Sequence, residues 1–339
     1  MERKIRKYRL VFILLLTILS VTCRAQDPQF SQFYAHSLYL NPAFTGNTVH
    51  GRAMLGYRNQ WPGISNQTYV TYAAAYDQNL PLIKSGAGFI MLYDRAGTGA
   101  LSFMNMGGLF SKTIRLTKKV FLRSGAHASY TFRNIDMNKL TFGDELLNGS
   151  GNTISKMTDV GVGYLDFNLG ALLYTKEMWL GVATHHINQP QQSLIGGDVR
   201  LPVKYSLHGG FRFLLTEDAN YKEVTSIMLA FNYKAEDKWD QFDLGAYYKI
   251  KSFVAGMWYR GIPGYKQYDQ GYSNHDAVVV IIGMKTEDYW IAYNYDVTIS
   301  RLALHSAGSH EVSFTYEFAS SRMDRMKAKG TLIVPCAKF

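Results

Sequence analysis

The stretch Val120–Phe132 reads VFLRSGAHASYTF, and its residues separate by parity into an apolar row and a polar row. The apolar row, taking every second residue, consists of Val120, Leu122, Ser124, Ala126, Ala128, Tyr130 and Phe132. The row between them includes Arg123, His127, Ser129 and Thr131. Because successive side chains of a β-strand point to opposite faces, this pattern is typical of a strand with one apolar face and one wet face.

Similar alternation recurs along most of the chain, in segments about as long as the ~9–11 residues that a tilted strand needs to cross a bilayer. The expected strands are Arg52–Arg58, Gln67–Asp77, Gly86–Tyr93, Phe103–Ile114, Val120–Arg133, Gly161–Tyr174, Trp179–His186, Val203–Leu215, Ser226–Lys234, Gln241–Ile250, Phe253–Arg260, Ala277–Lys285, Tyr289–Val297 and Glu311–Phe318. We therefore predict an all-β fold, a transmembrane antiparallel β-barrel of about 14 strands.

A water-soluble β-sandwich would also show alternation, so the direction of burial has to be argued separately. The strand number is too large for one sandwich, and no second domain boundary is visible. The 24 Tyr, 19 Phe and 5 Trp suit aromatic girdles at the membrane surfaces. In this interpretation the lumen-facing charged and polar candidates are Arg123, His127, Asp166, Lys204, His208, Arg212, Asp243, Lys249, Asp296, Glu311 and Glu317. They either pair inside the barrel or line a path for a charged solute.

Residues 1–25 have the pattern of a secretory signal peptide, with basic residues, an apolar run and a small residue before the expected cleavage after Ala25. A lipoprotein signal that modifies Cys23 is the less favoured alternative. Cleavage removes six positive charges and one negative charge, so the formal charge falls from +10 to +5. The remaining basic balance, without a nucleic-acid-binding motif, gives no reason to expect nucleic acid as a partner. Cys336 would be the single cysteine left, which excludes an intrachain disulfide.

The rest of the mature chain divides into three parts. Residues 26–50 are rich in aromatic residues and show no sustained period, which indicates a plug, a lid or a short periplasmic element. Residues 51–319 form the barrel, with Arg133–Met157 as the longest external loop. Residues 320–339 form a basic periplasmic tail. An even strand number places both termini on the periplasmic side.

The chain carries no pattern that indicates catalysis, a metal or a cofactor, and we predict that it is not an enzyme. His185 and His186 are adjacent, but on a strand they would diverge, one into the lumen and one to the membrane interface. Ser309, His310 and Glu311 are residue types found in catalytic triads, but strand neighbours point apart. A barrel phospholipase that assembles its site across strands remains the enzymatic alternative.

Several scattered phrases resemble the PorP/SprF family of outer-membrane proteins, which belong to the type IX secretion system of Bacteroidetes-type bacteria. The matching stretches are Gln26–Phe33, Asn41–Gly46, Tyr57–Pro62, His186–Pro190, Leu201–Tyr205, Trp258–Pro263, Tyr293–Asp296 with Ser300, Gly308–Glu311 and Cys336–Phe339. Together they extend over the mature chain from end to end.

The resemblance implies a non-enzymatic barrel in the outer membrane of a Gram-negative bacterium, embedded in the lipid bilayer. It also implies partners: a periplasmic ring lipoprotein or peptidoglycan-binding component of the secretion machinery, and a secreted surface adhesin or other cargo. The family motifs supply the candidate partner-binding residues, which are Asn41, Pro42, Trp61, Asn188, Gln189, Pro190, Arg260, Asp296, Ser309, His310, Glu311 and Cys336. The alternative function is a barrel that transports small or hydrophobic solutes, with residues 26–46 as its plug.

Overall fold

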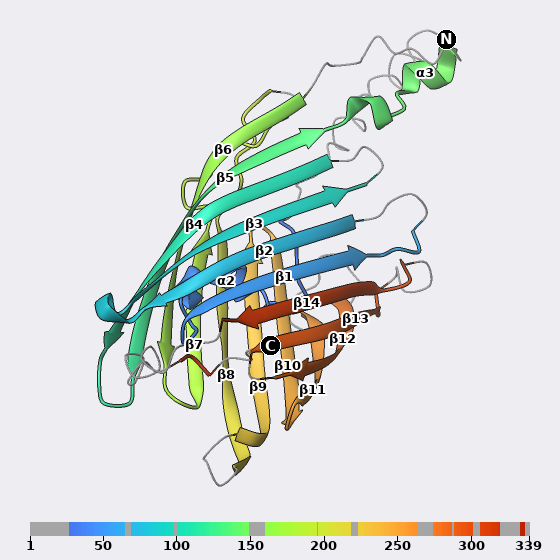
Figure 1. Cartoon of the computed structure of the whole chain (residues 1–339). Helices are drawn as coiled ribbons and strands as arrows, with labels where there is room; N and C mark the ends of the chain where they lie inside the picture. The colour runs from blue at the N-terminus through green and yellow to red at the C-terminus, as the bar shows by residue number, and fades with distance from the viewer. Residues whose placement is uncertain are drawn as a thin grey trace, which may run out of the picture.

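In the part of the chain that the structure describes, fourteen strands form a closed antiparallel barrel, with β1 (Gly51–Gln60) closing the ring against β14 (Ser309–Glu317) (Figure 1). This computed structural model describes residues 27–64, 69–97, 101–148, 160–194, 196–217, 223–262, 274–286, 288–300, 306–318 and 333–335. No helix among these residues is long and apolar enough to cross a membrane.

Every strand pairs with its neighbours in sequence. The remaining strands are β2 (Tyr69–Leu80), β3 (Ser85–Ala96), β4 (Leu101–Arg115), β5 (Phe121–Ile135), β6 (Val160–Tyr174), β7 (Met178–His185), β8 (Lys204–Glu217), β9 (Glu223–Glu236), β10 (Trp239–Ile250), β11 (Phe253–Ile262), β12 (Asn274–Lys285) and β13 (Tyr289–Thr298). The described helices are all short, namely α2 (Ser37–Leu40), η1 (Pro42–Phe44), η2 (Pro81–Ile83), η3 (Met137–Lys139) and α3 (Gly143–Asn148). The prediction of a 14-stranded antiparallel barrel is confirmed, and each expected strand overlaps an observed one.

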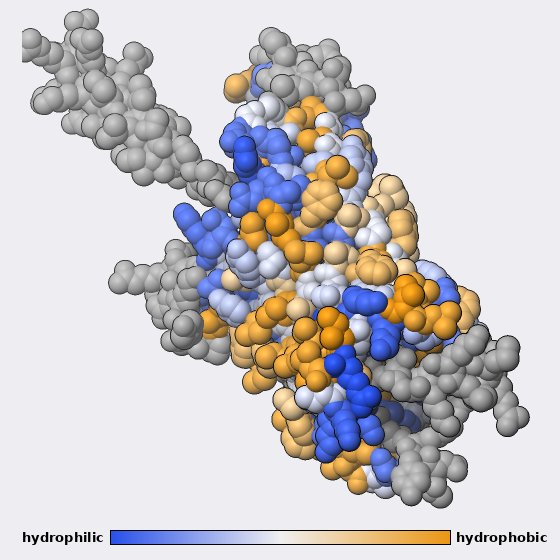
Figure 2. Space-filling model, turned by 90° about the vertical axis from the view of Figure 1, so that its left-hand side faces the viewer, coloured by the Kyte–Doolittle hydropathy of each residue, from blue (hydrophilic) through white to orange (hydrophobic). Residues whose placement is uncertain are grey.

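The two rows of each strand face in the predicted directions. In the polar row of β5, Arg123 is 2% exposed and Thr131 is 1% exposed, whereas Tyr130 in the apolar row is 50% exposed. Figure 2 shows the consequence on one side of the molecule, where apolar side chains cover much of the outer surface of the wall. The rings and aliphatic groups therefore form the surface that faces lipid, and the polar row faces the interior.

The connections at the two ends of the barrel differ in length. At the end where β1 begins, they are short turns such as 175–177 and 251–252. At the other end they include 136–159 and 186–203. Outer-membrane barrels have short turns on the periplasmic side and longer loops outside. We therefore call these the periplasmic end and the outer end.

Residues 27–50, the N-terminal segment, lie inside the barrel, where α2 is visible behind the wall in Figure 1. The segment bonds to strands around the whole ring: Ser31 to β14, Tyr34 to β8, Asn41 to β6 and Gly46 to β2. Asp27 lies at the outer end, beside Lys204 at the start of β8. The segment thus runs through the lumen from the outer end to the periplasmic end, and Asp27 does not have the periplasmic position that was predicted for the N-terminus.

Glycines in the wall make room for the N-terminal segment. A Cβ on Gly56 of β1 would lie 2.0 Å from the His36 ring, and one on Gly170 of β6 would lie 2.0 Å from the Asn41 side chain. The segment also packs its rings against the inward aromatic residues of the wall. The ring centroids of Phe33 and Trp258 are 4.7 Å apart. This apolar packing fills part of the lumen beneath the outer cavity.

β7 is shorter than its neighbour β6, so the wall is lower at β7, and this difference changes the position of His186. β7 ends at His185, and His186 has a φ of +57° that takes the chain out of the strand. Both histidines are buried. The prediction that one of them lies at the membrane interface is wrong, because strand alternation does not extend past the end of β7.

Three predicted segments fall partly or wholly outside the described residues. Residues 1–26, which include the expected signal peptide, lie outside them. In the predicted external loop Arg133–Met157, β5 continues to Ile135, and η3 and α3 follow. Of residues 320–339 only Ile333–Pro335 is described, and there the Val334 N–H donates to Asn47 Oδ1 at 2.8 Å and the Val334 side chain is buried.

Candidate functional site

The outer half of the lumen holds a network of buried charges. Arg58 of β1 bridges two carboxylates, lying 2.9 Å from Asp296 of β13 and 3.1 Å from Glu311 of β14. All three side chains are at most 3% exposed. Arg260 of β11 extends the network, 3.0 Å from Asp243 of β10 and 3.5 Å from Asp296. Buried charges are costly unless they are paired and hydrogen-bonded, and here each has a partner from another strand.

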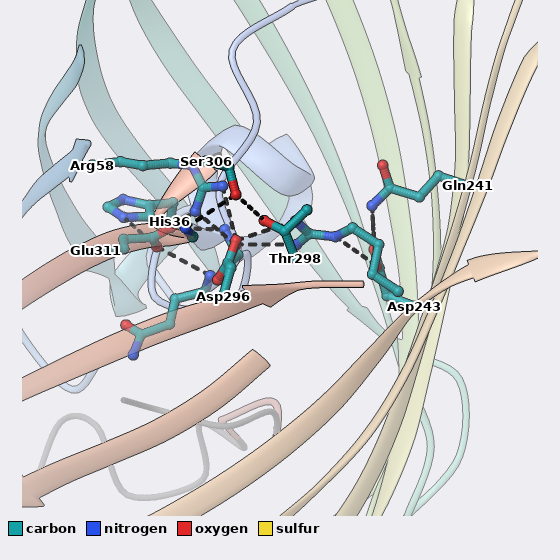
Figure 3. Close-up of polar contacts among 12 residues, drawn as sticks. His36, Arg58, Gln241, Asp243, Asp296, Thr298, Ser306 and Glu311 are labelled. Atoms are coloured by element: carbon teal, nitrogen blue, oxygen red, sulfur yellow. Dashed lines mark hydrogen bonds and ion pairs between the residues drawn. The ribbon is translucent and has the colours of Figure 1, made fainter. Parts of the chain in front are cut away.

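The N-terminal segment completes this network. The Ser31 hydroxyl donates to Asp296 at 2.5 Å and accepts from Arg58 at 2.7 Å. The Glu311 carboxylate accepts the backbone N–H groups of Ser31 and Gln32 at 2.8 and 3.0 Å. Figure 3 shows the side chains of Arg58, Asp296 and Glu311 converging. Arg260 of β11 also donates to the Ser31 hydroxyl at 3.2 Å, so the network ties the segment to four strands of the wall.

A second cluster holds the beginning of the segment. Asp27 pairs with Lys204 and lies 2.9 Å from Nε2 of His186, whose Nδ1 is 2.9 Å from Asp166. Burial alone would raise the pKa of the Asp27 carboxyl, but the Lys204 ammonium and the His186 imidazolium hold this pKa well below its usual value. Burial would lower the pKa of His186, but Asp27 and Asp166 offset it and raise this pKa to about 9. His186 is therefore charged at neutral pH.

Asn41 anchors the middle of the segment. Its amide nitrogen donates to the backbone oxygens of Ala171 and Val182 at 3.3 and 2.9 Å and lies 3.1 Å from His208 Nε2. Its side-chain oxygen accepts the N–H of Ala43 at 2.9 Å and so caps η1, which begins at Pro42. One asparagine thus joins the segment to three strands.

A cavity of about 820 Å³ lies at the outer end, above these contacts. Asp27, Pro28, Gln29 and Phe30 line its floor, and the aromatic residues around it include Trp61, Tyr164 and Trp239. Two charged residues of β9, Lys234 and Glu236, also line it. Neither side chain makes a direct hydrogen bond or close ion pair with a described residue, although Lys234 interacts electrostatically with Asp243 and Glu236 interacts with Lys204. The cavity thus combines rings with charges of both signs that make no direct hydrogen bond within the described residues, which suits recognition of a polar partner.

The structure brings some of the predicted site residues together. Arg260, Asp296 and Glu311 share the buried network, and Ser309 lies beside the cavity with Arg260 and Asp296. Trp61 also lines the cavity, with its ring 5.9 Å from that of Tyr69. Asn41 and Pro42 lie lower in the lumen.

The other predicted residues lie apart. His310 points outward and bonds to Tyr293 at 2.7 Å. Asn188 is exposed and donates to the Leu165 oxygen of β6 at 2.7 Å, Gln189 forms a turn, and Pro190 is buried. Cys336 lies outside the described residues.

Sequence reasoning missed four residues that complete the site: Asp27, Ser31, Arg58 and His186. Parity does place Arg58 in the lumen, because it follows Arg52 and Met54 in the inward row of β1. Asp27 and Ser31 lie in a segment without a period, so their only signal was their place in the motif Gln26–Phe33.

A closed barrel with an apolar outer face, a polar lumen and unequal connections defines the class of outer-membrane β-barrel proteins. The family model for "Type IX secretion system membrane protein PorP/SprF" matches residues 22–316, and the chain belongs to this family. The family implies interaction with other secretion-system components, and together with the barrel it supports an outer-membrane location.

Among solved structures, the chain is similar to the toluene transporter TodX of P. putida, with 12% identity, a TM-score of 0.49 and coverage of 83% of this chain and 93% of that one. It is also similar to a FadL homologue of Pseudomonas aeruginosa, with 11% identity, a TM-score of 0.42 and coverage of 79% and 90%. The comparison with curated proteins found no match.

Proposed function

We propose that this chain is a non-enzymatic, closed barrel of the type IX secretion system that holds a secreted protein, such as a surface adhesin, at its outer end. In this proposal the periplasmic end links the barrel to the ring or peptidoglycan-binding components. The observation that carries the proposal is the course of the N-terminal segment, which crosses the lumen and bonds to opposite walls through Ser31, Asn41 and Gly46. A lumen filled in this way supports a docking role rather than a pore.

The chemistry of the outer cavity supports a polypeptide as its occupant. Its rings, together with Lys234 and Glu236, offer both apolar contact and charges of either sign, which protein interfaces use. An apolar solute would remove water from these charges without offering them a hydrogen bond, at a cost in binding free energy.

The periplasmic end carries an arc of exposed basic residues that suits an acidic partner. On the turns and strand ends between β2 and β7 the exposed basic residues are Lys84, Lys112, Arg115, Lys118, Lys119 and Lys176. Opposite charge steers association and selects partners. This arc supports the proposed periplasmic link.

The test has two arms. In planar bilayers the purified barrel should give no steady conductance, and from native outer membrane it should copurify with secretion-system components and a secreted protein, identified by mass. Charge reversal of Lys118 and Lys119 should release the periplasmic partner, whereas Lys251→Glu, on the opposite part of the rim, should not. Steady porin-like conductance without copurifying secretion components would overturn the proposal in favour of solute transport.

A further inference from the structure

The outer part of β6 extends beyond its neighbour β7. The two strands pair only between Leu169 and Tyr174 of β6. Beyond this ladder the chain after β7 supplies a few bonds: the Ile187 N–H donates to the Phe167 oxygen at 3.1 Å, and Asn188 bonds to Leu165 and Phe167. Further toward the outer end, β6 is paired with β5 alone.

Apart from the Leu165 oxygen, which accepts from Asn188, the backbone groups that this edge presents to the β7 side have no partner among the described residues. Phe167 and Leu165 present their backbone groups to the β7 side, so by the alternation of a strand Gly163 and Gly161 do the same. Within the part of the chain that the structure describes, the N–H groups of Gly161, Gly163 and Leu165 and the oxygens of the two glycines make no hydrogen bond. Gly161 and Gly163 are exposed on the outer face.

This edge also lacks the features that usually protect a free strand. The sequence Val160–Leu165 is VGVGYL, with no charge and no proline, whereas natural edges are protected by lysine, proline or bulges. Free edges do not occur in contact with hydrocarbon. A strand of 15 residues is about 50 Å long, or about 35 Å high when tilted by ~45°, which exceeds the ~25 Å apolar band. The free edge therefore lies above the lipid, where a partner reaches it.

We infer that the edge Gly161–Leu165 of β6 is a docking site for an extended segment of the secreted protein, which adds to the wall as a strand. The inference rests on the proposed function and names the binding mode. Unpaired N–H and C=O groups in a row are matched by another extended backbone, and strand addition to a free edge is a general mode of peptide recognition. The outer cavity begins directly behind this edge, since Tyr164 of β6 lines it together with Gln192 and Leu201.

The cavity distinguishes a secreted segment from a second copy of the barrel. Two copies of this edge would pair over about five residues, far below the ~1,200 Å² that a stable interface buries. A segment with a free end or a loop buries more surface, because it pairs with the edge and then turns into the cavity toward Lys234 and Glu236. The edge supplies register through backbone bonds, and the cavity supplies side-chain contacts.

The experiment compares Gly163→Pro with the matched control Gly163→Ala. Both add a Cβ near the Tyr130 hydroxyl, whose ring is free to turn outward, but only proline removes the edge N–H. The N–H lost points away from β5, so the β5–β6 ladder remains. Each variant is purified from native outer membrane, and the secreted protein that copurifies is quantified against the wild type. Hydrogen exchange with residue-level mass spectrometry is measured on the complex and on the stripped barrel.

The expected result is that the amides of Gly161, Gly163 and Leu165 exchange rapidly in the stripped barrel and about 100-fold more slowly in the complex. Gly163→Pro should reduce the retained secreted protein about tenfold, the effect of one lost hydrogen bond, while Gly163→Ala retains it. Unchanged exchange in a complex that does hold a secreted protein would overturn the edge site and leave the proposed function standing. Protection already present in the stripped barrel, or a dimer of this chain, would overturn it as well. Absence of any secreted protein from the wild type would overturn the proposed function itself.

Discussion

The wall of the barrel and the N-terminal segment inside it belong to one chain but are held by different interactions. In the wall, backbone ladders run through every strand pair, so a residue on the outer row has only to be apolar. In the segment, individual side chains such as Ser31 and Asn41 make the bonds to the wall. The wall should therefore tolerate changes that keep the apolar or polar class, whereas the segment depends on particular atoms.

The largest effect is expected from breaking the buried network that joins the two regions. Arg58→Met leaves Asp296 and Glu311 without their shared guanidinium and should lower the free energy of unfolding by about 3–5 kcal/mol. Urea unfolding of the barrel in detergent, followed by tryptophan fluorescence, measures it. Arg200→Met removes an exposed ion pair with Asp198 and is the control, with no measurable change expected. Equal stability of both variants would show that the network does not hold the segment.

The next largest effect tests the outer row of the wall. Leu169 is exposed at the middle of the apolar row of β6, so Leu169→Arg should cost about 2–4 kcal/mol in a bilayer. Leu169→Met keeps the apolar class and should be neutral. Refolding into vesicles at a series of urea concentrations gives both values. If arginine were tolerated as well as methionine, this row would not face hydrocarbon.

The Asp27 cluster predicts a pH dependence of stability. The pKa of His186 is raised from 6.5 to about 9, so its contribution is complete below pH 6.5 and is lost as the pH rises through 9. At pH 8 the loss should reach about 2 kcal/mol. The pKa of Asp27 is lowered, so its contribution is lost only in acid, below the usual carboxyl range. His186→Gln should remove the alkaline loss, and an unchanged pH profile in this variant would contradict the assignment.

The smallest effect compares two asparagines that the sequence singles out equally. Asn41→Ala removes the cap of η1 and the bonds to β6 and β7, and should cost about 1–2 kcal/mol. Asn188→Ala should cost less, because water replaces the bonds of an exposed side chain. The same urea titration ranks the two. A larger loss of stability for Asn188→Ala would contradict the comparison, because particular side chains would then matter more in the wall than in the segment.

The wall was predictable because strand geometry is periodic. Parity alone assigns Arg123 to the lumen and Tyr130 to the outside, and the ladder then fixes the neighbouring strands. Parity no longer predicts the direction of a side chain once the strand has ended. His186 shows this, because alternation would place it outside, whereas its positive φ turns it inward.

The site was predictable only in part. Arg260, Asp296 and Glu311 were named from family motifs, but their convergence depends on a closed ring, which brings together strands far apart in sequence. Ser31 and Asp296 are separated by 265 positions and lie in contact. The N-terminal segment has no period, so nothing local in its sequence indicates which strands it meets or that it enters from the outer end.

The most direct test of the central claim is the accessibility of the N-terminal segment in native membranes. Ser37 of α2 is 1% exposed inside the barrel, whereas Leu82 on a periplasmic turn is 88% exposed. In a Cys336→Ser background, Ser37→Cys and Leu82→Cys are each treated with a small membrane-permeant thiol reagent and the rate of labelling is measured. The account predicts rapid labelling at position 82 and protection at position 37. Labelling of both positions at the same rate would contradict it, because the segment would then lie outside the lumen.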